Sequence, residues 1–349
     1  MKVSFGIHLA PPGPLLRRDE VSQFSDLVRM AEDYGATALG TYDSAFIGGD
    51  AFVRATAIAL ASRHAQVGLR PTNPLTREPQ VMASFLASID SLTEGRAFMD
   101  IATGDSAVLN IGYKIASRRR MEEYVACIRA LLADGEATYL GRPQRVHWHT
   151  RALRQRIPIS LCVEGPRMLH LGGRIGDAVI AGTGLLPEII TDTIARIHAG
   201  AGAAGRATGD IDVWFTTRTA LHEDRAQALA NVRASISSIL NHSMRQTLED
   251  KHVPEELRAK IEEYVKGYVL YDHVASSGEN TKRMEALGLT DYATRRFALA
   301  GNPEDWIARI EELAHSGATK LWLNAEGGRM ERQVHYMRFL GERVMSHFV

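Results

Sequence analysis

Residues 157–199 read IPISLCVEGPRMLHLGGRIGDAVIAGTGLLPEIITDTIARIHA, and this stretch decides the fold class. The apolar run Ile157–Val163 has the length and composition of a buried strand, and a helical pattern over Arg167–Gly173 follows it. A strand over Ala178–Ala181 and a helix over Pro187–Ala199, with proline in its first turn, repeat that order. Strands that alternate with helices in this way pair in parallel, with the helices covering the sheet.

The same alternation runs along the rest of the chain. The other expected strands are Val3–Leu9, Ala38–Tyr42, Gln66–Arg70, Ala97–Ala102, Ile211–Ala220 and Leu321–Leu323. The other expected helices are Glu20–Tyr34, Ala51–Arg63, Gln80–Leu92, Arg119–Leu132, a long helix from near Asp224, Pro303–Ala314 and Met330–Met345. Eight such units predict an α/β protein with a (β/α)8 TIM barrel, which typically takes ~250 residues.

The remaining length predicts two insertions, a hairpin near 135–156 and a helical or irregular segment over 245–300. No long linker of Gly, Ser or Pro divides the chain, so we expect residues 1–349 to form a single domain. A doubly wound sheet is the alternative, but it needs a glycine-rich loop after its first strand, and LAPPG at 9–13 does not supply one. Gly200–Gly205 (GAGAAG) matches a dinucleotide-binding spacing but follows a helix, so we interpret it as a flexible helix terminus.

Composition narrows the class of protein. There are 41 basic and 41 acidic residues, 45% apolar residues and 23% charged residues. These values exclude wholesale disorder, and the balanced charge gives no overall basic field, which argues against nucleic acid as the main partner. No apolar run reaches the ~18 residues of a membrane span, and the N-terminus lacks a signal-peptide pattern. Two cysteines, Cys127 and Cys162, are too few for a disulfide framework. We expect a cytoplasmic protein with no membrane or nucleic-acid partner and no metal site.

In a barrel of this kind, the active site lies where the strands end. His8 lies near the end of the first expected strand, and Asp43 and Asp105 follow the second and fourth. We take these three residues as the catalytic candidates for proton transfer or for holding substrate. A turn cap explains Asp43 and Asp105 equally well. Tyr268, Tyr271 and His273 either form a substrate wall or pack the second insertion onto the barrel. Arg295 and Arg296 either meet an anionic substrate or lie at the surface.

Two strand exits have a physical signature. After the fifth strand, EGPRM at 164–168 opens a helix, whose free N–H groups and dipole favour phosphate; an ordinary helix start is the alternative. After the third strand, RPTNP at 70–74 places two prolines around two polar residues. Proline cannot continue a central strand, so the chain bulges or simply exits there.

The chain resembles the bacterial luciferase-like family of flavin and deazaflavin enzymes, and in particular its methylenetetrahydromethanopterin reductase branch. The resemblance runs in order over nearly the whole chain. The segments that carry it are Asp26–Gly35, Val67–Ser84, Ile89–Gly95, Thr103–Gly112, Ile157–Gly173 and Phe297–Gly317. It implies a TIM barrel that holds a reduced flavin, or the deazaflavin coenzyme F420, at the ends of its strands, and it implies a homodimer or larger homo-oligomer.

The resemblance also assigns residues to the cofactor. The implied cofactor-binding residues are Pro71, Thr72, Asn73, Thr103, Gly104, Glu164, Gly165, Pro166, Arg167, Met168, Gly182 and Thr183. Residues 165–168 would hold the phosphate, Thr103 and Gly104 would line the ring or ribityl side, and Asn73 would touch the ring. Asp43 would lie beneath it and Asp105 beside the reacting centre. Family members carry a bulge behind the ring, often with a cis bond, so we predict that Arg70–Pro71 is cis.

Two departures from the branch shape the functional prediction. The pterin reductase has a glutamate where this chain has His8, and deazaflavin enzymes commonly have a histidine where this chain has Ser44. These differences favour an FMN-dependent monooxygenase that uses oxygen and a small organic substrate. Its reduced FMN would come from a separate NAD(P)H:flavin reductase, because the chain has no dinucleotide-binding unit of its own.

Two other functions stay open. The first is an F420-dependent reductase or dehydrogenase that transfers hydride, with a groove for the oligoglutamate tail at Arg151, Arg154 and Arg156, which otherwise form an ordinary basic loop. The second is a flavin-binding protein without catalysis, which would lack a substrate pocket.

Overall fold

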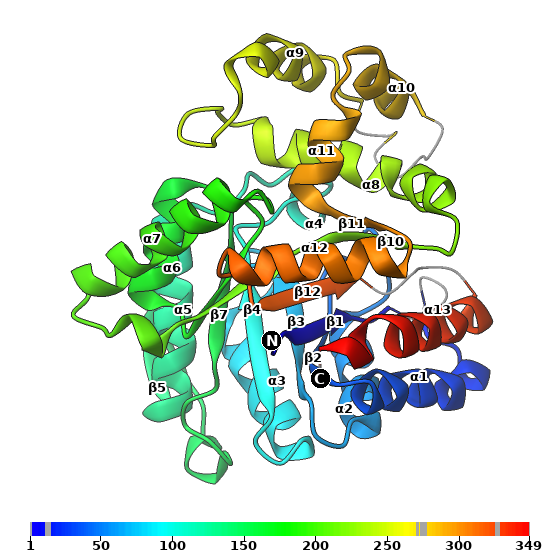
Figure 1. Ribbon diagram of the computed structural model, residues 1–349. Coiled ribbons are helices and arrows are strands. Elements are labelled where there is room, and N and C mark those ends of the chain that lie inside the picture. Colours follow the sequence, from blue (N-terminus) through cyan, green and yellow to red (C-terminus); the bar gives the residue numbers. More distant parts are fainter. Residues whose placement is uncertain (1, 11–14, 270–271, 273–277, 325–328, 349) are drawn as a thin grey trace.

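Eight parallel strands close into a barrel in the order β1-β12-β9-β8-β7-β4-β3-β2 (Figure 1). The computed structural model describes residues 2–10, 15–269, 272, 278–324 and 329–348. The barrel strands are β1 Ser4–His8, β2 Ala36–Thr41, β3 Gln66–Thr72, β4 Ala97–Ile101, β7 Ile159–Val163, β8 Ala178–Ala181, β9 Asp212–Thr216 and β12 Lys320–Asn324. The predicted TIM barrel is confirmed.

Helices cover the outside of the barrel because each buries one apolar face on it. In α1, for example, Phe24, Leu27, Val28 and Ala31 are buried at the spacing of one helix face. The covering helices are α1 Val21–Asp33, α2 Ala51–Ala61, α3 Pro79–Leu92, α5 Arg118–Ala133, α6 Pro166–Ile175, α7 Pro187–Ala203, α12 Pro303–His315 and α13 Met330–Arg343. A short helix, α4 Ser106–Leu109, follows β4.

The barrel interior has its own packed layer of Ala38, Phe98, Ile180, Trp214 and Trp322. Gly6 faces this layer, and a Cβ there would lie 2.6 Å from the Trp322 ring, so only glycine leaves room for the indole. Side chains thus fill this level of the barrel, and a site of this fold lies at the carboxyl ends of the strands.

The predicted strand over Ile211–Ala220 is wrong as a single element. It divides into β9 and β10 (Arg218–Leu221), and β10 leaves the barrel to pair in parallel with β11 (Ala298–Gly301). The break falls at Thr217, whose backbone N–H and hydroxyl both donate to the carbonyl oxygen of Trp322 at 3.1 Å. The apolar alternation continues through the break, so the sequence shows one run where the structure has two strands.

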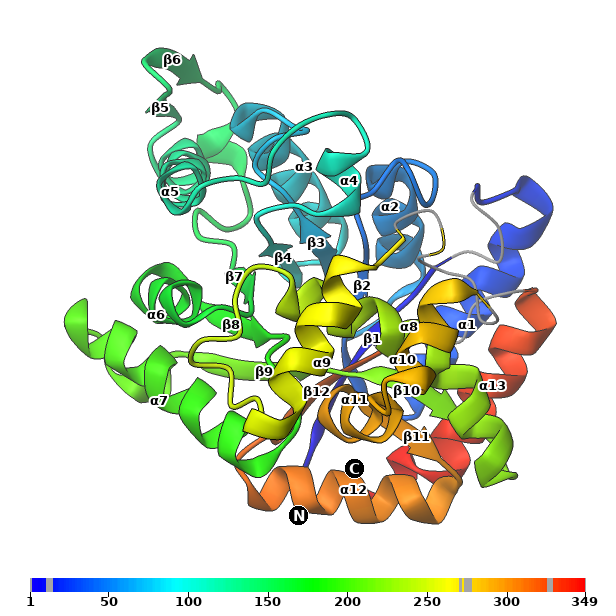
Figure 2. The same cartoon turned by 90° about the horizontal axis from the view of Figure 1, so that it is seen from above.

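The second insertion is larger than predicted because it includes the long helix before it. We call α8 (Arg225–Met244), α9 (Glu255–Lys266), α10 (Glu279–Ala286) and α11 (Thr290–Phe297) the helical cap. Its apolar side chains form a cluster separate from the main core. The helical cap lies over one end of the barrel (Figures 1 and 2). Tyr271 and His273 lie outside the described residues.

The first insertion contains the expected hairpin, with β5 Glu136–Tyr139 antiparallel to β6 Arg142–Arg145. It projects at the end of the barrel opposite the helical cap (Figure 1). Among the described residues, no helix combines the length and the apolar character needed to cross a bilayer.

We interpreted Gly200–Gly205 (GAGAAG) as a flexible helix terminus, and this interpretation is wrong for Gly200. Gly200 lies inside α7, and a Cβ there would lie 2.0 Å from the carbonyl oxygen of His170 in α6. The glycine therefore allows two helix backbones to touch. Gly202, two residues on, has no atom within 4 Å of the same position.

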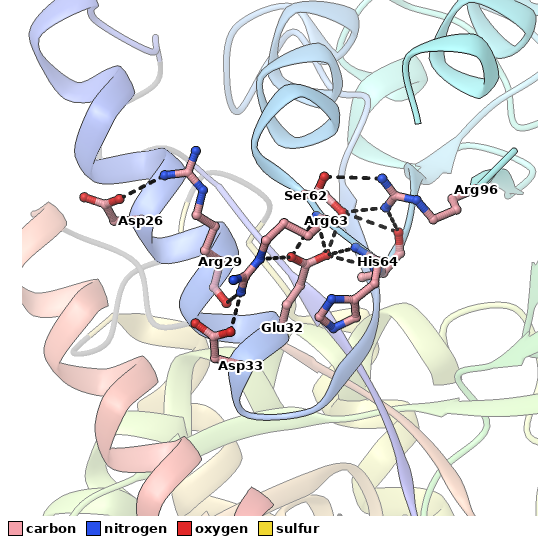
Figure 3. A network of polar contacts seen from close by, with 9 residues as sticks. Asp26, Arg29, Glu32, Asp33, Ser62, Arg63, His64 and Arg96 are labelled. Carbon is pink, nitrogen blue, oxygen red and sulfur yellow. Dashed lines mark hydrogen bonds and ion pairs between the residues drawn. The ribbon is translucent and has the colours of Figure 1, made fainter. Parts of the chain in front are cut away.

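A buried carboxylate joins α1 to the start of β3 (Figure 3). The Glu32 oxygens accept the backbone N–H groups of Arg63, His64 and Ala65 at 2.8–3.0 Å and the Ser62 hydroxyl at 2.7 Å. Burial alone would raise the pKa of Glu32, but these donors lower it to about 2. Glu32 thus stays ionised and fixes the loop that feeds a barrel strand.

Candidate active site

A cavity of about 650 Å³ opens at the carboxyl ends of the strands, between the barrel and α8. Most of the predicted site residues line it, namely His8, Asp43, Pro71, Thr72, Asn73, Thr103, Gly104, Asp105, Glu164, Gly165, Met168 and Gly182. Pro166 and Thr183 line a much smaller neighbouring cavity instead, and Arg167 is exposed. The volume suits a small-molecule or cofactor site.

Asp43 holds the ends of β2 and β3 together. Its carboxylate accepts the Thr72 hydroxyl at 2.8 Å and the Arg77 guanidinium at 3.0 and 3.1 Å. Arg77 also reaches Asp50 at 3.0 Å. Because both Asp43 oxygens are engaged by the protein, this carboxylate suits positioning better than proton transfer.

The exit of β3 has the geometry expected from its two prolines. The Arg70–Pro71 bond is cis, as predicted, and the pairing of β3 with β4 shifts between Leu69 and Thr72. The Asn73 side chain accepts the backbone N–H groups of Leu75 and Thr76 at 3.0 Å, which fixes the following turn.

The Arg70 side chain lies in the floor of the cavity. It donates to the Cys162 sulfur at 3.4 Å, lies 4.7 Å from the Trp322 ring and is 3.6 Å from the Asp100 carboxylate. Asp100 is buried, and this burial raises its pKa to about 7, although Arg70 and Ser160 act in the opposite direction. The floor is therefore a cation over a carboxyl group that is half-protonated near neutral pH.

Asp105, Glu164, His242 and Arg245 form a charged network on one wall, which we call the His242 network. The Asp105 carboxylate is 2.8 Å from His242 Nδ1 and 2.7 Å from Arg245 Nη2, and His242 Nε2 is 3.3 Å from Glu164 Oε1. Glu164 first, and then Asp105, raise the pKa of His242 to about 10. His242 is thus an imidazolium at neutral pH.

The two carboxylates of this network remain ionised. Burial would raise the pKa of Asp105, but hydrogen bonds from His242 and Arg245 hold it well below its usual range. Burial likewise opposes ionisation of Glu164, and the His242 charge with a Ser243 hydrogen bond lowers its pKa. The network joins the helical cap, through α8, to the ends of β4 and β7.

His8 lies on the opposite wall, stacked on Tyr42 with ring centroids 5.2 Å apart. Burial, followed by the charges of Arg70, Arg54 and Arg218, lowers its pKa to about 3, so the ring is neutral. No described residue hydrogen-bonds to its ring nitrogens. Of the three catalytic candidates, His8 alone has its polar atoms free to meet a ligand.

The start of α6 presents backbone to the cavity. Gly165 is the N-cap, no side chain caps the helix, and a Cβ built on Gly165 meets no atom within 4 Å. Free N–H groups at such a helix end favour phosphate. The side chain of Arg167 does not line this cavity, so the cation expected there is absent from the lining.

The proposed tail groove at Arg151, Arg154 and Arg156 is wrong in its position. Arg154 donates to Asp90 at 3.0 Å, and Arg156 pairs with Asp177. Both acidic residues precede barrel strands, so these arginines lie at the amino ends of the strands, away from the cavity. Charge pairing with the barrel explains Arg154 and Arg156.

Among the charged cavity residues that sequence reasoning missed are Arg218, His242 and Arg245. His242 and Arg245 follow no barrel strand and carry no motif, so nothing local marks them. Arg218 does follow one, and placing the end of the seventh strand at Thr216 would have found it. Within the described ranges, no three His, Cys, Asp or Glu side chains come together to hold a metal ion.

Comparison with known proteins agrees with this architecture. A family model described as luciferase-like monooxygenase matches residues 3–320. A 5,10-methylenetetrahydromethanopterin reductase from Methanolobus tindarius is 25% identical over 323 residues, covering 91% of this chain and 93% of that protein.

Two solved structures share the fold. The coenzyme F420-dependent tetrahydromethanopterin reductase from Methanopyrus kandleri superposes with a TM-score of 0.77 at 23% identity, over 100% of both chains. A monooxygenase from Streptomyces bottropensis superposes with a TM-score of 0.69 at 18% identity, over 99% of this chain and 100% of that one.

Proposed function

The chain belongs to the luciferase-like monooxygenase family, and on that premise we propose that it is an F420-dependent oxidoreductase that transfers a hydride between the deazaflavin and a small organic substrate. The observation that carries this proposal is its likeness over the full length to the F420-dependent reductase of Methanopyrus kandleri. The reductase from Methanolobus tindarius supports it over nearly the same length. This reverses the order of the two alternatives drawn from His8 and Ser44, because similarity along the whole chain outweighs two single positions.

The residues present fit a phosphate-bearing ring cofactor. The α6 N-terminus has uncapped backbone N–H groups and open space at Gly165, and the cavity of about 650 Å³ continues from it across the barrel end. A bound deazaflavin supplies a two-electron hydride donor or acceptor. In this proposal the free backbone N–H groups at the start of α6 hold its phosphate, and Thr103, Gly104, Asn73 and Pro71 line its ring.

The chain's own residues then orient the substrate and manage its proton. The Asp105 oxygens are occupied by His242 and Arg245, and those of Asp43 by Thr72 and Arg77. We therefore assign His8 to the substrate, where its neutral ring would donate to or accept from the oxygen or nitrogen next to the reacting carbon. α8 of the helical cap covers part of the cavity, which limits access of water.

A paired anaerobic titration tests the function. The pure protein is titrated with F420 and with FMN, each in oxidised and reduced form, and binding is followed by cofactor absorbance and calorimetry. We expect tight binding of F420 and weak binding of FMN. Tight binding of reduced FMN alone would favour the second candidate, an oxygen-using monooxygenase supplied by a separate flavin reductase, which the fold shared with the Streptomyces enzyme supports.

A further inference from the structure

One corner of the cavity contains polar atoms that the protein leaves unused. Arg218 of β10 and His8 of β1 supply them. Asn324 of β12, which pairs in register with His8, also lines the cavity, but its Nδ2 donates to the Thr217 carbonyl oxygen at 3.4 Å. In the part of the chain that the structure describes, no residue hydrogen-bonds or ion-pairs with the Arg218 guanidinium. Most other cavity cations are engaged: Arg245 with Asp105, His242 with Asp105 and Glu164, and Lys251 with the Ser243 carbonyl oxygen.

The backbone around Arg218 is held from both sides. Thr217 donates its N–H and hydroxyl to the Trp322 carbonyl oxygen at 3.1 Å, and the Thr219 hydroxyl donates to the Asn324 carbonyl oxygen at 2.9 Å. Arg218 itself pairs in register with Ala298 of β11. These contacts fix the backbone position from which the half-buried Arg218 side chain extends. A side chain on a fixed backbone loses less conformational freedom when it binds a ligand.

The charges around Arg218 favour a negatively charged ligand. Arg70 in the floor adds a second positive charge near Arg218, and their proximity is unfavourable for both. The nearest carboxylates, Glu164 and Asp105, are already shared with His242 and Arg245. An anion at Arg218 would relieve this repulsion and accept the fork of N–H donors that arginine presents.

We propose that Arg218 and His8 form an anion subsite that binds a carboxylate or phosphate group of the substrate. This inference rests on the proposed function and gives the substrate class, namely a small organic molecule with an anionic group. The guanidinium supplies the charge, and one nitrogen of the neutral imidazole adds a hydrogen bond to the anionic group. The other ring nitrogen is left for the oxygen or nitrogen next to the reacting carbon, so the substrate is oriented from its charged end.

The test titrates F420-loaded protein with inorganic phosphate and, separately, with acetate, and follows cofactor fluorescence and calorimetry. We expect one of the two anions to bind, and Arg218→Met to weaken it about tenfold or more. Arg218→Lys should restore part of the affinity. The matched control is Arg295→Met, because Arg295 is exposed and does not line the cavity. Unchanged binding of both anions in Arg218→Met would overturn the subsite.

The affinity for F420 shows whether Arg218 binds the substrate or the cofactor. If Arg218 serves the substrate, Arg218→Met should leave the F420 dissociation constant within about twofold. If that constant rises instead, while the affinity for the deazaflavin chromophore without its phosphate tail is unchanged, Arg218 binds the cofactor tail and our assignment is wrong. The anion titrations are repeated on cofactor-free protein. If F420 fails to bind, that result counts against the proposed function, and the anion titrations on cofactor-free protein still test the subsite.

Discussion

His242 Nδ1 lies 2.8 Å from Asp105 Oδ2, although the two residues are 137 positions apart in the chain. This contact joins α8 of the helical cap to the loop after β4. It also places an imidazolium in the wall of the cavity, because Glu164 approaches the other ring nitrogen at 3.3 Å. The His242 side chain thus links the helical cap to the ends of β4 and β7.

The His242 network predicts a pH dependence of stability. The pKa of His242 is raised from 6.5 to about 10, so its contribution is complete below pH 6.5 and is lost as the pH rises towards 10. Wild type should therefore lose stability relative to His242→Gln across this window, by no more than about 1.4 kcal/mol per pH unit. Urea unfolding of both proteins at pH 6.5, 8 and 9.5 measures this, and parallel curves would contradict it.

Glu32 predicts the opposite dependence in acid. Its pKa is lowered from 4.5 to about 2, so its contribution is present above pH 4.5 and is lost as the pH falls towards 2. Glu32→Gln should cost about 2–3 kcal/mol at pH 7 and flatten the stability curve between pH 4.5 and 2. Asp33→Asn is the control, since Asp33 is 60% exposed and its pairing with Arg63 is worth under about 1 kcal/mol. Equal losses in the two variants would refute the role of Glu32.

Gly200 and Gly202 form a matched pair for the contact between α6 and α7. Gly200→Ala places a Cβ 2.0 Å from a backbone oxygen, so the helices must move apart, at a cost of about 3 kcal/mol. Gly202→Ala meets no atom within 4 Å and should be neutral or stabilise by up to about 1 kcal/mol. Thermal unfolding followed by circular dichroism compares them, and similar melting temperatures would disprove the close contact.

Gly165 predicts where the cofactor phosphate binds. Gly165→Val fills open space at the start of α6, so folding should be unchanged while F420 binding weakens about tenfold or more. Gly209→Val is the control, because it also meets open space but lies away from the cavity. Calorimetric titration gives both affinities. Undiminished binding by Gly165→Val would move the phosphate elsewhere.

Asp100 predicts a protonated carboxyl group inside the barrel. Its pKa is raised to about 7, mainly by burial, so the folded protein retains this proton between pH 3.8 and 7 and loses stability as the pH rises through that window. Infrared difference spectra should show a protonated carboxyl band at pH 5 that fades by pH 8 and is missing in Asp100→Asn. No such band at pH 5 would show that Arg70 keeps Asp100 ionised.

The sequence was sufficient for the barrel and for the lining residues at the strand ends, because both follow from local patterns. Short apolar runs predict buried strands, and the residue after each run lies at the open end of a parallel barrel. His8, Asp105 and Gly165 were found in this way.

The partners of these residues were not predictable by the same means. His242 and Arg245 reach the cavity only because the helical cap folds back over the barrel, which is a long-range contact without a local signal. Arg218 was hidden by an apolar alternation that continues past Thr217, where hydrogen bonds to Trp322 redirect the chain. The prediction of FMN depended on two single positions, His8 and Ser44, whereas similarity along the whole chain favours F420.

The pairing of β10 with β11 has a consequence for how such enzymes diversify. Leu221 and Gly301 are neighbours in one small sheet, so the chain leaves the barrel and returns to it at nearly the same place. The segment between them carries its own apolar cluster, so a change in its length need not alter the order or register of the barrel strands. Natural or engineered variation in the helical cap can therefore change which substrates enter the cavity while the barrel beneath it is kept.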